Sequence, residues 1–172
     1  NFGGKSVTNN VRILGVGADY AEITRRKILV GRTFTPYHIE SRSSVCLIGY
    51  EIAQRLFSGI SPEGQIIYAT SSNPRPFACK VIGVLKPQTS NQEWSQPNLQ
   101  ILTPYTAYAN VAENEWDTLI RQAVLQITSG ADVEKTGKKI KAYFETKYGK
   151  SGKFYVDSDA VLISQMKRFL SI

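Results

Sequence analysis

The sequence predicts an α+β fold in which both chain ends build one layer and a mainly β section is inserted between them. Three observations predict it. A strand and a short helix open the chain, strands with long polar loops fill the middle, and strands alternate with helices in the last third. Hydrophobic residues make up 42% of the 172 residues, which is enough for a core and excludes a disordered chain.

The opening section contains two strand patterns and two helix patterns. Val11–Val16 predicts a strand, and Asp19 can cap a short helix directly after it. A turn and loop follow at Gly31–Pro36. Val45–Ile48 then predicts a short buried strand, and Glu51–Phe57 predicts a helix whose apolar residues share one face.

The middle section predicts mainly strands. Gln65–Ala69, Phe77–Leu85 and Leu99–Thr103 are apolar runs, separated by a turn at 71–76 and a polar loop at Lys86–Asn98. Alternation along the second run predicts that every other residue points to one face of the sheet. These residues are Phe77, Cys79, Val81, Gly83 and Leu85.

The last third returns to mixed structure. Ile120–Thr128 alternates and predicts a strand, and Asp132 is placed to cap a helix that ends at Gly149. A short strand at Phe154–Val156 and a final helix capped by Asp157–Asp159 follow. The first of these helices has an apolar stripe that we expect in the core. The stripe consists of Val133, Ile140, Tyr143, Phe144 and Tyr148.

The chain is basic, with a formal net charge of +7. Lysines crowd the helix after Asp132 and its exit, and Arg25–Lys27 form a second cluster. A solvated face is the first interpretation, and contact with anionic headgroups or an acidic partner is the second. Nucleic-acid binding needs exposed aromatic side chains between the basic ones. Because the aromatic residues of this helix are expected in the core, the sequence predicts no nucleic-acid partner.

The sequence contains no pattern that specifies catalysis, a cofactor or a metal. His38 is the only histidine and lies in a polar run, where a solvated side chain is expected. Gly15–Gly17 follows a strand as in a dinucleotide loop, but Tyr20 stands at the third glycine position. Lys139 stands where a phosphate-binding loop needs Ser or Thr after Gly137–Lys138. We therefore predict a protein that is not an enzyme.

Two cysteines and two tryptophans leave alternatives open. Cys46 and Cys79 lie in apolar runs and are expected to be buried, either as small hydrophobic residues or as a disulfide in an oxidising compartment. Trp94 lies in the polar loop, where it is either a binding anchor or folded back onto the domain. With Gln92 and Glu93 it is the candidate partner contact. Trp116 is expected to pack in the interior.

Five short motifs in chain order resemble the signature of the MacB-like periplasmic core domain, including its "GRxFT" block. They are Gly31–Thr35, Val45–Gly49 with Glu51–Phe57, Pro62–Ile67, Phe77–Leu85 and Leu102–Thr106. The run Phe77–Leu85 carries one extra residue relative to the family pattern, and the two cysteines also depart from it. The chain starts without Met and its last apolar pattern stops while still helical, so we interpret it as a domain cut from a longer protein.

The resemblance implies a porter-like α+β subdomain built from residues 1–30 and 116–172, with a sabre-like, mainly β subdomain at 31–115 inserted between them. It also implies an extracytoplasmic domain of an ABC-type export permease in the inner membrane, on the periplasmic side. Such a domain has no catalytic activity and no cofactor of its own. Its implied partners are a membrane-fusion (adaptor) protein, a second copy in the full-length permease, and a nucleotide-binding domain reached through the membrane segments.

Two further readings of function stay open at this point. A lipoprotein-releasing or cell-division permease domain has a related fold. A stand-alone basic module that binds nucleic acid or anionic surfaces belongs to another class, and steep salt dependence of DNA binding would identify it. These residues do not indicate which substrate is transported.

Overall fold

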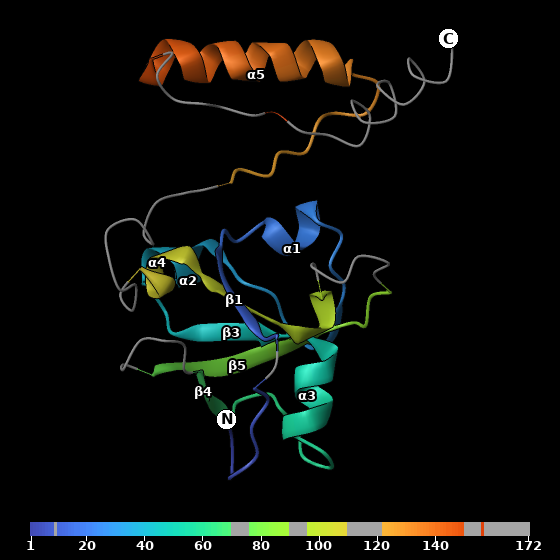
Figure 1. Cartoon of the computed structure of the whole chain (residues 1–172), viewed down its shortest axis with the longest axis vertical. Coiled ribbons are helices and arrows are strands. Elements are labelled where there is room, and N and C mark those ends of the chain that lie inside the picture. Colours follow the sequence, from blue (N-terminus) through green and yellow to red (C-terminus); the bar gives the residue numbers. More distant parts are fainter. Residues whose placement is uncertain (9, 70–75, 90–95, 110–121, 150–155, 157–172) are drawn as a thin grey trace. The chain divides into compact units, whose positions relative to one another are not determined.

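The computed structural model describes residues 1–8, 10–69, 76–89, 96–109, 122–149 and 156. The chain divides into two compact units, Asn1–Val124 and Leu125–Ile172, which are described separately. The first unit holds a mixed sheet and short helices, and the second holds one long helix (Figure 1). The α+β class predicted from the sequence is thereby confirmed.

Six strands of the described residues form one sheet in the order β1-β6-β3-β5-β2, with β4 also paired to β5. They are β1 (Arg12–Val16), β2 (Ile28–Gly31), β3 (Val45–Ile48), β4 (Ile66–Ala69), β5 (Phe77–Leu85) and β6 (Gln100–Pro104). The β1–β6 and β3–β5 pairs are parallel, and the other pairs are antiparallel. Strands from both sides of residue 30 thus belong to one sheet, and the subdomain boundaries stay a prediction.

One helix covers one face of the sheet and three short helices lie on the other face (Figure 1). The helices are α1 (Tyr20–Ile23), α2 (Pro36–Glu40), α3 (Tyr50–Leu56) and α4 (Tyr105–Tyr108), with a 3-10 turn η1 (Pro97–Leu99). Helix α3 places Ile52, Ala53 and Leu56 in the first core cluster, as its apolar face predicted. A second cluster on the opposite face includes Phe34, Leu47 and Leu102. Hydrophobic burial on both faces is the main stabilising term of this unit.

The long strand β5 contains a bulge that changes which face its residues occupy. Cys46 pairs with Val81, but the next residue of β3, Leu47, pairs with Gly83, so Ile82 is an extra residue on β5. Before the bulge, Cys79 and Val81 belong to the first core cluster, whereas Leu85 belongs to the second. The prediction that alternate residues of the whole run share one face is therefore wrong beyond Val81, because one extra residue reverses the alternation.

The strand β2 was not predicted, since Gly31–Pro36 was expected to be a turn and loop. Gly31 ends β2 with φ of +81°, and a Cβ there would lie 2.3 Å from the carbonyl oxygen of Ile82. Only glycine allows both this backbone conformation and this close approach of β2 to β5. The opening glycine of the "GRxFT" block is thus a packing requirement of the sheet edge.

The second unit is built around α5 (Val133–Tyr148). The Asp132 side chain accepts a hydrogen bond from the backbone N–H of Lys135 at 2.9 Å, and Gly149 follows the helix with φ of +81°. Both caps were predicted. Tyr143 and Tyr148 are 58% and 57% exposed, so the prediction that they are core residues is wrong.

Two further predictions concern the ends of this unit. Residues Gln122–Thr128 form no strand and are mostly exposed, so this part of the predicted strand at Ile120–Thr128 is wrong. An alternating run needs a neighbouring strand before its pattern becomes a strand, and here none pairs with it. The predicted strand at Phe154–Val156 and the final helix lie outside the described residues, apart from Val156, which is in neither a strand nor a helix.

Candidate functional site

The loop at Lys86–Asn98 carries the three candidate contact residues, Gln92, Glu93 and Trp94, which themselves lie outside the described residues. The structure describes the neck of this loop. The Asn98 side-chain amide donates to the carbonyl oxygen of Gln88 at 2.9 Å, and its Oδ1 accepts from the Gln88 backbone N–H at 2.9 Å. The Asn98 side chain thus makes the pair of hydrogen bonds that a neighbouring strand would make with Gln88, and it holds the two ends of the loop together.

A buried arginine anchors the far end of the neck. Arg26, in the segment after α1, donates from Nη2 to the carbonyl oxygen of Pro97 at 2.8 Å and from Nη1 to Gln100 Oε1 at 2.9 Å. Its Nε has no hydrogen-bond partner among the described residues. Burial lowers the pKa of Arg26 from its ordinary value, and proximity to Tyr20 opposes this shift. The basic cluster Arg25–Lys27 was interpreted as solvated, and for Arg26 that interpretation is wrong.

Close backbone packing fixes the neck against α3. Gly49, the residue before α3, donates its backbone N–H to the carbonyl oxygen of Gln100 at 2.8 Å. A Cβ at Gly49 would lie 2.2 Å from the carbonyl oxygen of Asn98. Leu99 contributes to the first core cluster beside these contacts. The neck is therefore held by a buried side chain, a backbone contact and hydrophobic packing.

His38 is a structural residue of α2. Its Nδ1 accepts the Thr35 backbone N–H at 3.0 Å, and Thr35 Oγ1 lies 2.9 Å from the same nitrogen. The ring therefore fills the place that Glu or Gln takes in a capping box, with Pro36 as the first residue of the helix. The spacing Thr35-x-x-His38 could have revealed this cap. The expected solvated loop residue is instead a helix cap.

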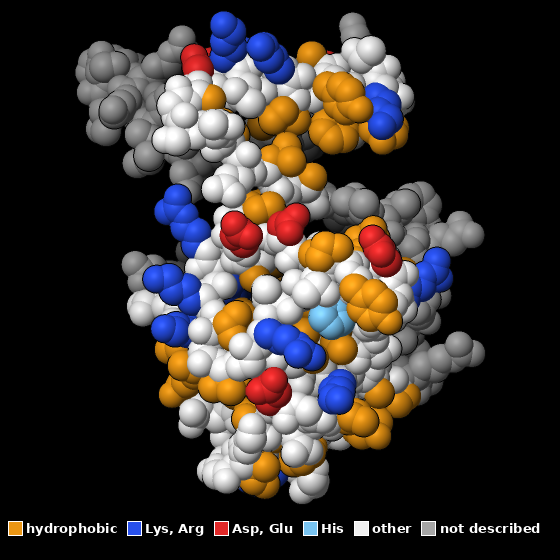
Figure 2. Space-filling model, turned by 180° about the vertical axis from the view of Figure 1, so that it is seen from behind, with side chains coloured by type: hydrophobic (Ala, Val, Ile, Leu, Met, Phe, Trp, Pro, Cys, Tyr) orange, Lys and Arg blue, Asp and Glu red, His pale blue; other side chains and the backbone are white. Residues whose placement is uncertain are grey.

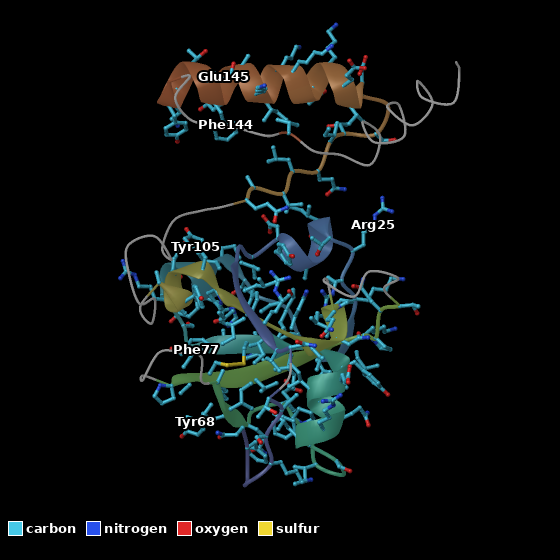
Figure 3. All side chains as sticks on the ribbon, viewed as in Figure 1. Arg25, Tyr68, Phe77, Tyr105, Phe144 and Glu145 are labelled. Carbon is cyan, nitrogen blue, oxygen red and sulfur yellow. A yellow bond between two sulfur atoms is a disulfide. The ribbon has the colours of Figure 1, made fainter. Side chains whose placement is uncertain are left out.

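The two small helices present exposed tyrosines. Thr106 Oγ1 donates to the carbonyl oxygen of Ile39 at 2.7 Å, which ties α4 to α2. Tyr37 on α2 is 70% exposed, and Tyr105 on α4 is exposed as well (Figure 3). Exposed tyrosines are common at protein interfaces, because the ring is apolar and the hydroxyl group hydrogen-bonds.

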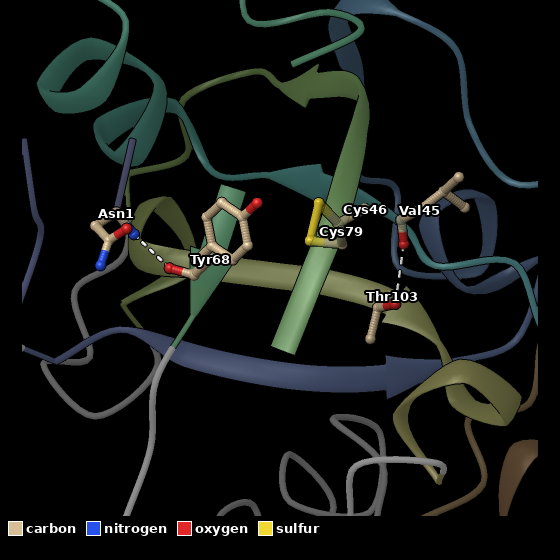
Figure 4. Close-up of a disulfide and its surroundings, with 6 residues drawn as sticks. All are labelled: Asn1, Val45, Cys46, Tyr68, Cys79 and Thr103. Carbon is tan, nitrogen blue, oxygen red and sulfur yellow. Dashed lines mark hydrogen bonds between the residues drawn. A yellow bond between two sulfur atoms is a disulfide. The ribbon is translucent and has the colours of Figure 1, made fainter. Parts of the chain in front are cut away.

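Cys46 and Cys79 form a disulfide between β3 and β5, with their Cα atoms 5.8 Å apart (Figure 4). The prediction that both are buried is confirmed, and of the two alternatives the structure has the disulfide. Phe77 lies close to it in the same core cluster (Figure 3). On the neighbouring pair of strands, the buried Thr103 hydroxyl donates to the carbonyl oxygen of Val45 at 2.9 Å. These links tie the three central strands together.

The lysines of α5 are exposed and partly paired within the helix. Lys138 lies 2.8 Å from Glu134 and Lys141 lies 3.9 Å from Glu145, each one turn apart. Lys147 lies over the rings of Tyr143 and Tyr148, and its hydrogen bond to the Tyr143 hydroxyl is the main cause of its raised pKa. On the face of α5 seen in Figure 2, basic side chains are spread along the helix beside hydrophobic ones, and acidic side chains lie toward one end. This arrangement fits the solvated-face interpretation of the cluster.

Within the described part of the chain, no three His, Cys, Asp or Glu side chains gather as a metal site. The same residues include no helix that is both long and apolar enough to cross a lipid bilayer. What these residues provide chemically is a clamped sheet, an anchored loop neck and exposed aromatic side chains.

Comparison with known proteins decides the family. Residues 1–143 match the MacB-like periplasmic core domain family, and this range contains all five sequence motifs from Gly31 to Thr106. The chain belongs to this family. The resemblance predicted from the sequence is thereby confirmed.

Two relatives are similar to different shares of the chain. The macrolide export ATP-binding/permease protein MacB of Syntrophobacter fumaroxidans is 30% identical over 95 residues, which cover 55% of this chain and 13% of that protein. The uncharacterized ABC transporter permease YknZ of Bacillus subtilis is 25% identical over 143 residues, which cover 83% of this chain and 33% of that permease. The chain thus spans a third or less of the length of these two relatives.

The MacB-like fold is also seen in a solved structure. The periplasmic region of MacB from Actinobacillus actinomycetemcomitans superimposes with a TM-score of 0.73 and 17% identity, covering 97% of this chain and 70% of that one. At this identity the likeness concerns the fold alone. It supports the prediction of a porter-like and sabre-like arrangement.

Proposed function

We propose that this chain is the extracytoplasmic domain of an ABC-type export permease, and that it transmits ATP-driven conformational change and docks an adaptor protein for substrate efflux. The family match over residues 1–143 carries the proposal. The whole permease would sit in the inner membrane with this domain on the periplasmic side. ATP would be hydrolysed by a cytoplasmic nucleotide-binding domain, and this domain itself would catalyse no reaction.

The links between strands support a mechanical role. The disulfide joins β3 to β5, the hydroxyl group of Thr103 joins β6 to β3, and Thr106 joins α4 to α2. A sheet tied in this way moves as one body, so displacement at one edge reaches the other edge without being absorbed between them. The full-length permease would contain two copies of this domain. Nucleotide binding would shift the equilibrium between two relative positions of these two domains.

The anchored neck supports a docking role for the loop it closes. Asn98 and Arg26 fix both ends of the segment that carries Gln92, Glu93 and Trp94. Holding the ends of a loop lowers the entropy that it loses on binding a partner, which strengthens the complex. We assign these three residues to the adaptor contact, with Trp94 as its aromatic anchor.

The test is binding of the purified domain to the adaptor encoded with the permease, measured by calorimetry. Trp94→Ala should weaken binding by about 30-fold or more, because truncation of an interface anchor costs about 2 kcal/mol or more. Tyr68→Ala, which removes an exposed aromatic side chain from β4, is the matched control and should leave affinity unchanged. Unchanged binding of Trp94→Ala would remove this residue from the interface.

The oligomeric state provides a second check. In the permease we propose a dimer held by membrane segments and nucleotide-binding domains, so the domain alone should be mainly monomeric. Analytical ultracentrifugation at micromolar concentration measures this directly. A tight dimer of the domain alone would mean that the dimer contact lies in this domain.

A further inference from the structure

The sulfur atoms of Cys46 and Cys79 are enclosed by the first core cluster. The two residues are 0% and 1% exposed, and Ile67, Phe77 and Val81 belong to the same cluster. Cys79 is also flanked by a strand on each side, since β5 pairs with β3 on one edge and with β4 on the other. Both cysteines are therefore shielded from solvent while these three strands are paired.

Formation or reduction of a disulfide requires a reagent to reach a sulfur atom, and the buried position of Cys46 and Cys79 hinders this. A disulfide forms or breaks when a thiolate attacks a sulfur atom, and a mixed disulfide with the attacking molecule is the intermediate. That intermediate needs room for a second molecule beside the sulfur. Buried structural cysteines are accordingly inert toward reagents in solution.

We propose that an oxidant that carries a reactive disulfide closes the Cys46–Cys79 bond before β3 and β5 pair, and that sheet assembly then seals the bond. The thiolate of one cysteine attacks the oxidant's disulfide, which forms a mixed disulfide and releases one oxidant thiolate. The thiolate of the second cysteine then attacks the mixed disulfide. The chain loses two electrons and two protons, and the oxidant's disulfide is reduced to a dithiol.

The position of the cysteines favours this order. They are 33 residues apart, and the segment between them contains α3 and β4. In the unfolded chain, both thiols face solvent, and the entropic cost of closing a loop of this length is modest. Once β3 and β5 pair, the oxidant reaches either sulfur only when the core opens, so oxidation is faster before the two strands pair.

The inference does not rest on adaptor docking. It asks only for an oxidising compartment, where disulfides form and persist. The experiment on the purified chain is independent of any transport assay, so failure of one proposal leaves the other untouched.

The first test compares the reduction of the oxidised chain by dithiothreitol in native buffer and in denaturing urea at one pH. Thiols are trapped with a maleimide and counted by mass spectrometry. Reduction in native buffer should be slower by about 100-fold or more, because it waits for an opening of the core. Equal rates in the two solvents would overturn the sealing of the bond.

The second test addresses the order of events. Reduced chain is diluted from urea either into oxidised glutathione or into buffer, with oxidised glutathione added after refolding. Oxidation should be fast in the first case and slower by about tenfold or more in the second. Equal rates, with a folded far-ultraviolet spectrum before late addition, would overturn the proposal. A reduced chain that stays unfolded supports it, because the bond then precedes the sheet.

A single-cysteine variant is the matched control. Cys46→Ala leaves Cys79 as a thiol that cannot pair. If its far-ultraviolet spectrum is native, its labelling by maleimide should be fast in urea and slow in native buffer. Fast labelling of this folded variant would show that solvent reaches the site and would contradict the sealed core.

Discussion

The guanidinium group of Arg26 reaches the carbonyl oxygen of Pro97, which lies 71 residues further along the chain, at 2.8 Å. It also holds Gln100 Oε1 at 2.9 Å. The crossover between α1 and β2 is thereby fixed to η1 and to the start of β6. A basic side chain that looks solvated in the sequence is thus a structural anchor of the proposed docking loop.

Arg26→Ala should destabilise the domain by about 1–3 kcal/mol, because it removes the two buried hydrogen bonds that the guanidinium group donates to the Pro97 carbonyl oxygen and to Gln100 Oε1. Urea unfolding followed by circular dichroism measures the change. The control is Lys27→Ala, which removes the same charge from an exposed neighbour and should have almost no effect. Equal losses in the two variants would mean that the charge, and not the anchor, stabilises the fold.

Asn98→Ala should loosen the loop while leaving the sheet intact. The change removes both hydrogen bonds to the Gln88 backbone, and Asn98→Asp keeps only the acceptor for the Gln88 N–H. Limited proteolysis followed by mass spectrometry should detect faster cleavage in the segment 88–98 for the alanine variant, with an intermediate rate for the aspartate variant. A cleavage rate equal to that of the wild type would show that the neck does not depend on this side chain.

Local sequence patterns predicted those helices and strands that can be recognised without knowing which distant residues they contact. β3, α3 and the cap of α5 at Asp132 follow from apolar runs and capping residues, and all three are present. The bulge at Ile82 could not be predicted, because strand register depends on distant neighbours. Likewise Gln122–Thr128 has a strand pattern, but no strand of the described residues pairs with it.

The candidate site shows the same division between local and non-local information. Trp94 was chosen because a large aromatic side chain stands in a polar loop, and that choice stays a prediction. The burial of Arg26 depends on residues more than 70 positions away. The local sequence, a cluster of basic residues, therefore predicted a solvent-exposed side chain. His38 had a usable local signal in its spacing to Thr35. A solvated loop residue was expected there because His38 lies in a polar run.

His38→Ala should cost about 1 kcal/mol of stability, since it removes the acceptor for the Thr35 backbone N–H at the start of α2. His38→Gln places a side chain that is common in capping boxes at the same position and should retain most of that stability. Chemical denaturation of the three proteins gives the comparison. Similar losses in both variants would point to packing of the imidazole ring instead of the cap.

Removal of the disulfide by the double change Cys46→Ala and Cys79→Ala should lower stability by roughly 3–4 kcal/mol. This is the value expected from loop-closure entropy for a bond that spans 33 residues. Unfolding in urea should be compared for the oxidised wild type and the double variant. A loss below about 1 kcal/mol would mean that the packing of β3 on β5 is sufficient without the bond.

Gly49→Ala should be the most damaging single change at the neck. Its Cβ would lie 2.2 Å from the carbonyl oxygen of Asn98, and this backbone atom can move only if the loop neck or α3 shifts. We expect a loss of about 3 kcal/mol or more, as for other overpacked sites. Gly17→Ala is the matched control, since a Cβ there has no described atom within 4 Å and should be tolerated. Thermal unfolding of both variants measures the difference in stability. If Gly49→Ala were as stable as Gly17→Ala, the neck would have room to move, and the preorganisation proposed for the docking loop would lose its support.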